Sequence, residues 1–159
     1  MKIMKVILQT VLSANVKILG NVVASISKGY LLLVGFTDGD TKETVDVLVD
    51  KIIKLRTFSD DHGLINLSLE DVDGQILSVS QFTLYADTTK GRRPSFTHAL
   101  NPNDALDLYE YFNKELEQKL SKPISTGVFG ADMKVESIND GPFTLILDSK
   151  ELVKWVKKY

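Results

Sequence analysis

The sequence predicts an α+β protein in which a mostly antiparallel, barrel-like β-sheet packs against two amphipathic helices. Short apolar segments bounded by glycine and asparagine turns predict strands at both ends of the chain. Two longer segments between them repeat apolar residues at helical spacing. Because the 159 residues include 43% hydrophobic ones, the chain can bury a core of its own. We expect one domain at residues 1–149, followed by a basic C-terminal extension at 150–159.

The first third of the chain is predicted to be β-structure. Four segments have strand-like composition, at residues 4–9 (MKVILQ), 15–18 (NVKI), 22–26 (VVASI) and 30–36 (YLLLVGF). Leu19-Gly20-Asn21 and Lys28-Gly29 separate them as tight turns. Consecutive strands joined in this way predict an antiparallel meander.

A helix is predicted next, beginning at Asp40, whose carboxylate can cap free backbone N–H groups with Glu43 three residues later. Its buried face would carry the apolar residues Val45, Leu48, Val49, Ile52 and Leu55. Residues 64–69 (LINLSL) and 75–84 (QILSVSQFTL) then read as strands around an Asp73-Gly74 turn. Ser80 and Gln81 should therefore lie near the C-terminal end of the second of these strands.

The second helix is predicted to begin at Asn101 and Pro102, which are a good cap and a good first-turn residue. Its apolar stripe consists of Ala105, Leu108, Tyr109, Phe112, Leu116 and Leu120, and Pro123 ends it. Two further strands are expected at residues 133–138 (MKVESI) and 143–148 (FTLILD). The turn residues 139–142 (NDGP) separate them.

Composition excludes several classes of chemistry. The chain has no cysteine and two histidines, so thiolate metal sites and cysteine nucleophiles are ruled out. No phosphate-binding or dinucleotide fingerprint and no paired histidine motif is present, so we expect neither a metal nor a cofactor. Asp60, Asp61 and His62 read as ordinary turn residues. No apolar run approaches the roughly 20 residues of a membrane span, and the N-terminus has no cleavage signal, so we expect a cytoplasmic protein.

Charge is balanced overall but clustered locally. The net charge of −2 gives the molecule no strong field toward nucleic acid. Lys90, Arg92 and Arg93 lie in a stretch without acidic residues, which makes them candidates for contacts with phosphates. The C-terminal lysines are Lys150, Lys154, Lys157 and Lys158. A solvated surface explains this second group more simply.

Residues 80–96 (SQFTLYADTTKGRRPSF) place two hydroxyl groups and an amide beside a basic loop. A threonine or serine nucleophile needs a base within hydrogen-bond reach, and the next histidine, His98, follows beyond Pro94. A conventional hydrolase that uses Thr83 with His98 is therefore possible but unsupported by the sequence.

Together with residues 139–149 (NDGPFTLILDS), this stretch resembles the paired signatures of the D-aminoacyl-tRNA deacylases, which hydrolyse D-amino acids from mischarged tRNA. The resemblance extends through residues 54–58 (KLRTF), 67–84 (LSLEDVDGQILSVSQFTL) and 126–135 (TGVFGADMKV). It implies the fold of that family and a homodimer whose active sites lie at the subunit interface.

The resemblance also implies roles for particular residues. Ser80, Gln81, Phe82 and Thr83 form the catalytic stretch of one subunit, with the Phe82 backbone N–H as oxyanion donor and Thr83 as a positioning residue. Gly141 and Pro142 of the other subunit, joined by a cis bond, form the substrate chirality filter. The tRNA 2′-OH would help to activate water, so no side-chain base is needed. Lys90, Arg92 and Arg93 would contact tRNA phosphates, with a solvated loop as the open alternative. Rejection of L side chains by backbone leaves D-amino acids of many kinds, and glycine, as substrates.

Two positions depart from the family pattern. Thr10 follows Gln9 where the family usually has an arginine that braces the Gly-Pro element, and Phe143 replaces the usual valine after it. Bracing of the interface is the property that these changes affect. Two alternatives remain open: a hydrolase with Thr83 as nucleophile, and a non-catalytic dimeric RNA-binding module.

Overall fold

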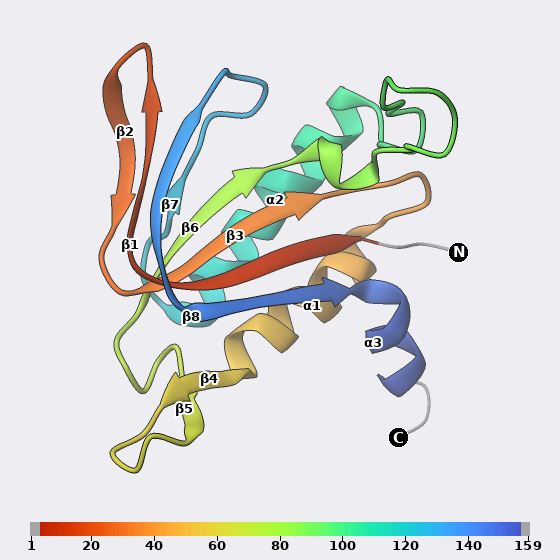
Figure 1. The fold of residues 1–159 in the computed structure, drawn as a ribbon. Coiled ribbons are helices and arrows are strands. Elements are labelled where there is room, and N and C mark those ends of the chain that lie inside the picture. Colours follow the sequence, from red (N-terminus) through yellow and green to blue (C-terminus); the bar gives the residue numbers. More distant parts are fainter. Residues whose placement is uncertain (1–3, 157–159) are drawn as a thin grey trace.

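The computed structural model describes residues 4–156, with side chains through residue 152. A six-stranded, strongly curved sheet occupies one side of the molecule, and two long helices cover one of its faces (Figure 1). The strands of this sheet are β1 (Lys5–Ile18), β2 (Asn21–Ile26), β3 (Gly29–Gly35), β6 (Gln75–Ser80), β7 (Ser125–Thr126) and β8 (Lys134–Asp148). The predicted α+β class with a barrel-like sheet and two main helices is confirmed.

Strand β1 organises the sheet. Its first half, Lys5–Val11, pairs with β3, and its last residues, Ala14–Ile18, pair with β2. Both pairings are antiparallel, whereas β3 pairs with β6 and β6 with β7 in parallel. The predicted meander is wrong, because β1 is long enough to accept two strands in succession and β3 therefore lies beside β1 rather than β2. The Ser125 hydroxyl of β7 donates to the Ser25 carbonyl of β2 at 3.2 Å, which nearly closes the barrel.

Helices α1 (Lys42–Lys54) and α2 (Pro102–Leu120) bury the predicted apolar faces against the sheet. The Asn101 side chain caps α2 by accepting the Asp104 N–H at 3.0 Å, as predicted. The cap of α1 lies one residue later than predicted, at Thr41, whose N–H donates to the Thr44 hydroxyl at 3.0 Å. Asp40 instead accepts the N–H of Thr37 at 2.8 Å and closes the preceding turn.

Strands β4 (Arg56–Ser59) and β5 (Ile65–Ser68) form a separate two-stranded sheet below the main one (Figure 1). Asp60 closes their hairpin by accepting the N–H groups of His62 at 2.9 Å and Leu64 at 3.0 Å. These hydrogen bonds lower the pKa of the Asp60 carboxyl, and the one from the Leu64 N–H has the largest effect. The acidic residues beside His62 thus form a turn, as the sequence indicates.

The strand predicted at residues 75–84 is too long. Strand β6 ends at Ser80, and a short 3-10 helix, η1 (Phe82–Tyr85), follows. The Leu84 N–H donates to the Gln81 carbonyl at 3.2 Å, which turns the chain away from the sheet. Ser80 and Gln81 nevertheless lie at the C-terminal end of β6, as predicted.

The two strands predicted around residues 139–142 are one continuous strand, β8, because β1 gives both halves the same partner. Gln9 pairs with Thr144, and Val11 pairs with Asn139. The four residues 140–143 between those partners have no place in the ladder and bulge out of it. We call residues 140–143 the Gly-Pro bulge.

Helix α3 (Ser149–Val156) follows β8 directly and lies beside α1 (Figure 1). It contains the first residues of the predicted C-terminal extension, including Lys150. The other C-terminal lysines lie outside the described part of the structure: Lys157 and Lys158 as whole residues, and Lys154 in its side chain.

Candidate functional site

A cavity of about 600 Å³ opens where β6 ends. Its walls come from the end of β6, from η1, from the start of α2 and from the segment that leads into β8. The lining is mainly apolar, with the aromatic rings of Phe82, Phe96 and Phe129, and Ser80 and Gln81 supply polar atoms. Small-molecule sites have this composition, in which a few polar groups fix the orientation of a ligand on an apolar surface.

The predicted catalytic stretch lies at the edge of this cavity. The Gln81 N–H donates to the Val34 carbonyl of β3 at 2.7 Å, and the Gln81 side-chain amide donates to the Thr83 hydroxyl at 2.5 Å. The ring of Phe82 is 56% exposed and meets Phe96 edge-on, with ring centroids 5.1 Å apart. Ser80, Gln81 and Phe82 line the cavity, whereas Thr83 is exposed beside it.

Two backbone N–H groups of this stretch precede the first hydrogen bond of η1. The first N–H groups of a 3-10 turn have no carbonyl within the turn to bind. In η1 these belong to Phe82 and Thr83, since the Leu84 N–H makes the first bond of the turn. Adjacent N–H groups of this kind can stabilise negative charge on an oxygen.

Gly35 supports the catalytic stretch from below, and the sequence prediction missed it. A Cβ atom at Gly35 would lie 3.0 Å from Tyr85 Cε2, 3.1 Å from the Gln81 carbonyl oxygen and 3.2 Å from Leu84 Cβ. Only a residue without a side chain lets η1 pack this closely on the end of β3. Burial raises the pKa of the Tyr85 hydroxyl beneath the same turn. A glycine near the end of a buried strand is a sequence signal for such close backbone approach.

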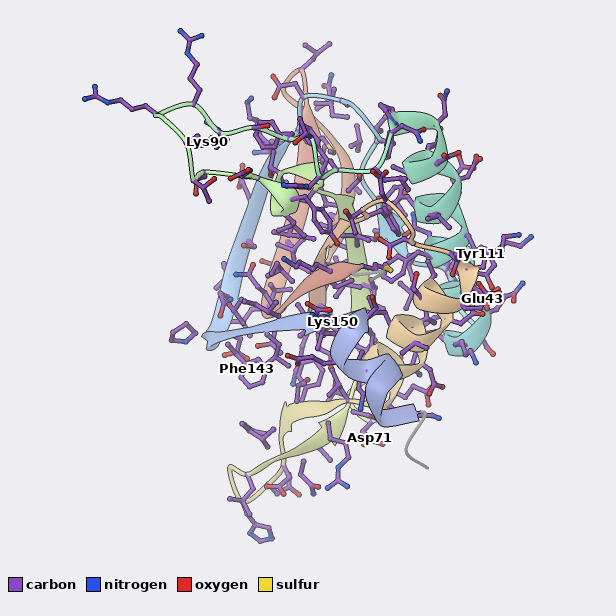
Figure 2. All side chains as sticks on the ribbon, turned by 90° about the vertical axis from the view of Figure 1, so that its right-hand side faces the viewer. Glu43, Asp71, Lys90, Tyr111, Phe143 and Lys150 are labelled. Atoms are coloured by element: carbon purple, nitrogen blue, oxygen red, sulfur yellow. The ribbon has the colours of Figure 1, made fainter. Side chains whose placement is uncertain are left out.

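The Gly-Pro bulge carries the predicted chirality filter. The Gly141–Pro142 peptide bond is cis, and both residues are exposed. Neither Asn139 nor any residue of the bulge is among the described residues that line the cavity. Figure 2 shows Phe143 well away from the loop of Lys90, which follows the catalytic stretch. Within one chain, the structure therefore does not bring Gly141 and Pro142 together with Ser80–Thr83.

Thr10 and Phe143, the two departures from the family pattern, both contact this bulge or belong to it. The buried Thr10 hydroxyl donates to the Asp140 carbonyl at 2.9 Å. Phe143 ends the bulge, and its N–H donates to the Asn139 side chain at 2.7 Å. Position 10 thus contacts the Gly-Pro element although it carries a short side chain.

The predicted tRNA contacts lie on a loop that projects from the body of the protein (Figure 2). Lys90, Arg92 and Arg93 are all exposed. Backbone hydrogen bonds between Asp87 and Ser95, at 2.7 and 2.9 Å, close the base of this loop. The Asp87 carboxylate accepts the hydroxyl and N–H of Thr89 at 2.6 and 2.9 Å, and these bonds lower the pKa of Asp87.

The predicted alternative base, His98, is engaged elsewhere. Its Nε2 lies 3.8 Å from an Asp87 carboxylate oxygen, and its carbonyl accepts the Thr37 hydroxyl at 2.5 Å. Among the described residues, His98 forms no hydrogen bond or ion pair with Thr83. The described part of the chain also holds no cluster of three histidine or acidic side chains able to bind a metal ion. None of its helices is both long and apolar enough to cross a membrane.

Comparison with known proteins identifies relatives along almost the whole chain. Residues 7–148 match the family described as D-Tyr-tRNA(Tyr) deacylase. A D-aminoacyl-tRNA deacylase of Flavobacterium johnsoniae is 52% identical over 147 residues, which are 92% of this chain and 98% of that protein.

Two solved structures share the fold. One is described as a c-Myc DNA unwinding element binding protein, with 36% identity and a TM-score of 0.85 over 90% of this chain and 97% of the other. The second is a probable eukaryotic D-amino acid tRNA deacylase, with 20% identity and a TM-score of 0.80 over 92% and 99% of the two chains. At that identity, the second supports the fold alone.

Proposed function

The chain belongs to the D-aminoacyl-tRNA deacylase family, and from this premise we propose how it removes D-amino acids from tRNA. It is an ester hydrolase of tRNA editing. The observation that carries the mechanism is the aromatic cavity whose lining includes Ser80, Gln81 and Phe82. This cavity would hold the 3′ end of the tRNA and present the aminoacyl ester to the backbone N–H groups beside it.

The walls of the cavity suit a nucleoside. Bases stack on aromatic side chains, and Phe82, Phe96 and Phe129 supply such surfaces. Ser80 and Gln81 would position the ribose and the ester through their polar atoms. The backbone N–H of Phe82, next to that of Thr83, would bind the oxyanion that forms when water attacks the ester carbonyl.

No side-chain base is needed in this scheme. The aminoacyl ester is already activated, so holding it against fixed donors and ordering a water supplies much of the catalysis. The 2′-OH of the terminal ribose would help to activate that water. Thr83 acts as a positioning residue, since its hydroxyl accepts a hydrogen bond from Gln81 and contacts no described base.

The active site would be completed by a second copy of the chain. The Gly-Pro bulge is exposed and lies outside the described cavity lining, so a partner must bring its own bulge to the ester. Strand β8 offers a surface for this association: in the described sheet it pairs with β1 alone, and Val135, Ile138 and Ile146 on it are 39%, 57% and 71% exposed. An exposed apolar edge of this kind favours pairing between chains.

Chirality would be read by the backbone of Gly141 and Pro142. Their carbonyls would accept the amino group of the substrate and leave no room for an L side chain. A D side chain would point to solvent, so amino acids of many kinds are accepted. Glycine has no side chain to reject, and glycyl-tRNA should therefore also be hydrolysed.

The exposed loop of Lys90, Arg92 and Arg93 would contact tRNA phosphates. We place this activity in the cytoplasm and expect it to need neither metal nor cofactor. The alternatives are a hydrolase in which Thr83 attacks the ester, and a dimeric module that binds tRNA without cleaving it. The first is weakened because, among the described residues, the Thr83 hydroxyl is hydrogen-bonded to the Gln81 amide and to no base, while His98 lies 3.8 Å from the Asp87 carboxylate.

The decisive experiment compares deacylation of D-tyrosyl-tRNA, L-tyrosyl-tRNA and glycyl-tRNA by the purified protein. We expect loss of the D and glycyl esters with the L ester spared, and slow cleavage of a D ester on tRNA that lacks the terminal 2′-OH. Equal cleavage of D and L esters would refute the chirality filter. Loss of activity in Thr83→Ala, with full cleavage of the 2′-deoxy substrate, would favour the nucleophile, and tRNA binding without cleavage would favour the binding module.

A further inference from the structure

The Gly-Pro bulge is tied at both of its ends by side chains. At its exit, the Asn139 side chain binds both backbone groups of Phe143: Oδ1 accepts the N–H at 2.7 Å, and Nδ2 donates to the carbonyl at 3.2 Å. At its entry, the Asp140 carbonyl accepts the Thr10 hydroxyl at 2.9 Å. These contacts replace the ladder hydrogen bonds that the bulge interrupts.

Thr10 is placed for this task by the pairing of β1. Its neighbours Gln9 and Val11 pair with Thr144 and Asn139, so Thr10 lies directly opposite the bulge. The side chain is 3% exposed, and a buried hydroxyl needs a hydrogen-bond partner. The Asp140 carbonyl is the partner that the structure gives it.

We propose that Thr10 and Asn139 are positioning residues that set the stringency of the chirality filter. The inference rests on the proposed function, since it concerns the segment proposed to reject L side chains. Neither residue belongs to the bulge itself. Each acts by fixing one end of a four-residue segment, and the two residues between those ends are Gly141 and Pro142.

The bulge must be held firmly in place if its shape is to discriminate between D and L esters. Rejection of an L side chain depends on a wall that does not yield, because specificity is the difference between two binding free energies. A misplacement of about 1 Å in a catalytic arrangement changes rates by about 100-fold. Loosening one end of the bulge should therefore admit the L ester and weaken the hold on the D ester, which lowers the D/L ratio of kcat/KM.

Thr10→Val tests this with the least change of shape, because it replaces the hydroxyl by a methyl group. Thr10→Ser keeps the hydroxyl and serves as the rescue. Thr57→Val is the matched control: Thr57 is 6% exposed, and its hydroxyl shares a 2.6 Å hydrogen bond with the Tyr30 hydroxyl in the core. The Thr57→Val variant therefore loses a buried hydrogen bond that does not involve the bulge.

The measurements are kcat/KM on D-tyrosyl-tRNA and L-tyrosyl-tRNA, the melting temperature, and amide hydrogen exchange at Phe143. We expect Thr10→Val to lower the D/L ratio about tenfold and to speed exchange at Phe143, with Thr10→Ser close to the wild type. Asn139→Ala should lower the ratio at least as much. Thr57→Val should melt at a similar temperature to Thr10→Val with the ratio unchanged.

An unchanged ratio in Thr10→Val and Asn139→Ala, or an equal fall in Thr57→Val, would overturn the inference. Failure of the proposed function has a different signature, because the wild type itself would then cleave both esters alike or neither. Hydrogen exchange separates the two cases. If exchange at Phe143 is faster in Thr10→Val while the wild-type D/L preference is intact and unaltered by the substitution, the brace exists but does not set stringency.

Discussion

Replacing Gly35 with alanine should displace the catalytic stretch without removing any of its atoms. The added Cβ would lie 3.0 to 3.2 Å from Tyr85, Gln81 and Leu84, and carbon atoms normally approach to about 3.5–4.0 Å. All three contacts belong to one segment at the end of β6. The readiest relaxation therefore moves this segment as a unit, by roughly half an ångström, away from β3.

The size of that displacement gives the expected fall in kcat. Since a misplacement of about 1 Å can cost about 100-fold in rate, half of it should lower kcat on D-tyrosyl-tRNA about tenfold. Overpacking should also lower the free energy of unfolding by about 1–3 kcal/mol. For a chain of this size, that corresponds to a fall in melting temperature of roughly 2–12 °C.

The assay is kcat at saturating D-tyrosyl-tRNA, measured well below the melting temperature. Gly74→Ala is the matched control, because its Cβ would meet the Leu69 side chain at 2.5 Å in the core, away from the cavity. It should lower stability with kcat unchanged. A folded Gly35→Ala protein with wild-type kcat, or an equal loss of kcat in Gly74→Ala, would refute the reasoning.

Three further predictions concern stability, pH and salt. Gly29→Ala would put a Cβ 1.8 Å from a backbone carbonyl oxygen of β6, so the free energy of unfolding in urea should fall by more than about 3 kcal/mol. The pKa of Asp87 is lowered chiefly by hydrogen bonds from Thr89, so its NMR titration should have a midpoint below about 3.9; the stability it contributes is present above that ordinary value and is lost as pH falls through the lowered one. Replacing Arg92 and Arg93 with alanine should reduce the slope of log Kd for tRNA against log salt by about 1 for each lost phosphate contact, with kcat at saturation unchanged.

Each of these predictions has a plain contrary result. For Gly29 it is an unfolding free energy like that of Gly20→Ala, whose added Cβ would meet no atom within 4 Å. For Asp87 it is a titration midpoint at or above the ordinary value, or one that does not rise in Thr89→Val. For the arginine pair it is an unchanged salt slope, which would assign the loop to solvent.

Local signals in the sequence were sufficient to predict α1 and α2, apart from the exact start of α1. Apolar spacing and the Asn101–Pro102 start placed α2, because capping and amphipathicity act within a few residues. The position of β3 beside β1 was not predicted, since strand order depends on contacts between distant residues. That residues 134–148 form a single strand was not predicted for the same reason, because the register of β8 is set by β1, more than a hundred residues earlier.

In the candidate site, too, local features could be predicted from the sequence, whereas contacts between distant residues could not. Ser80 ends β6, and Gln81, Phe82 and Thr83 begin the turn that follows it, so these residues are neighbours simply because they are consecutive in the chain. The resemblance singled out position 10, but the hydrogen bond from the Thr10 hydroxyl to the Asp140 carbonyl could not be predicted, because it depends on the bulge of residues 140–143 opposite that position. Only the resemblance pointed to Gly141 and Pro142 as part of the proposed site, because residues that would meet across a subunit interface leave no periodicity in the sequence.

A site without a side-chain base depends on how firmly its backbone is held, and the two halves of this one are held differently. The turn after β6 is fixed by packing on Gly35, whereas the bulge is fixed by hydrogen bonds from Thr10 and Asn139. Displacing the turn would move the proposed oxyanion donors, which would serve D and L esters alike, so Gly35→Ala should slow both and leave their ratio intact. Loosening the bulge changes which ester fits, so Thr10→Val should alter the ratio. Rate and chirality would thus be separable by one substitution in each half.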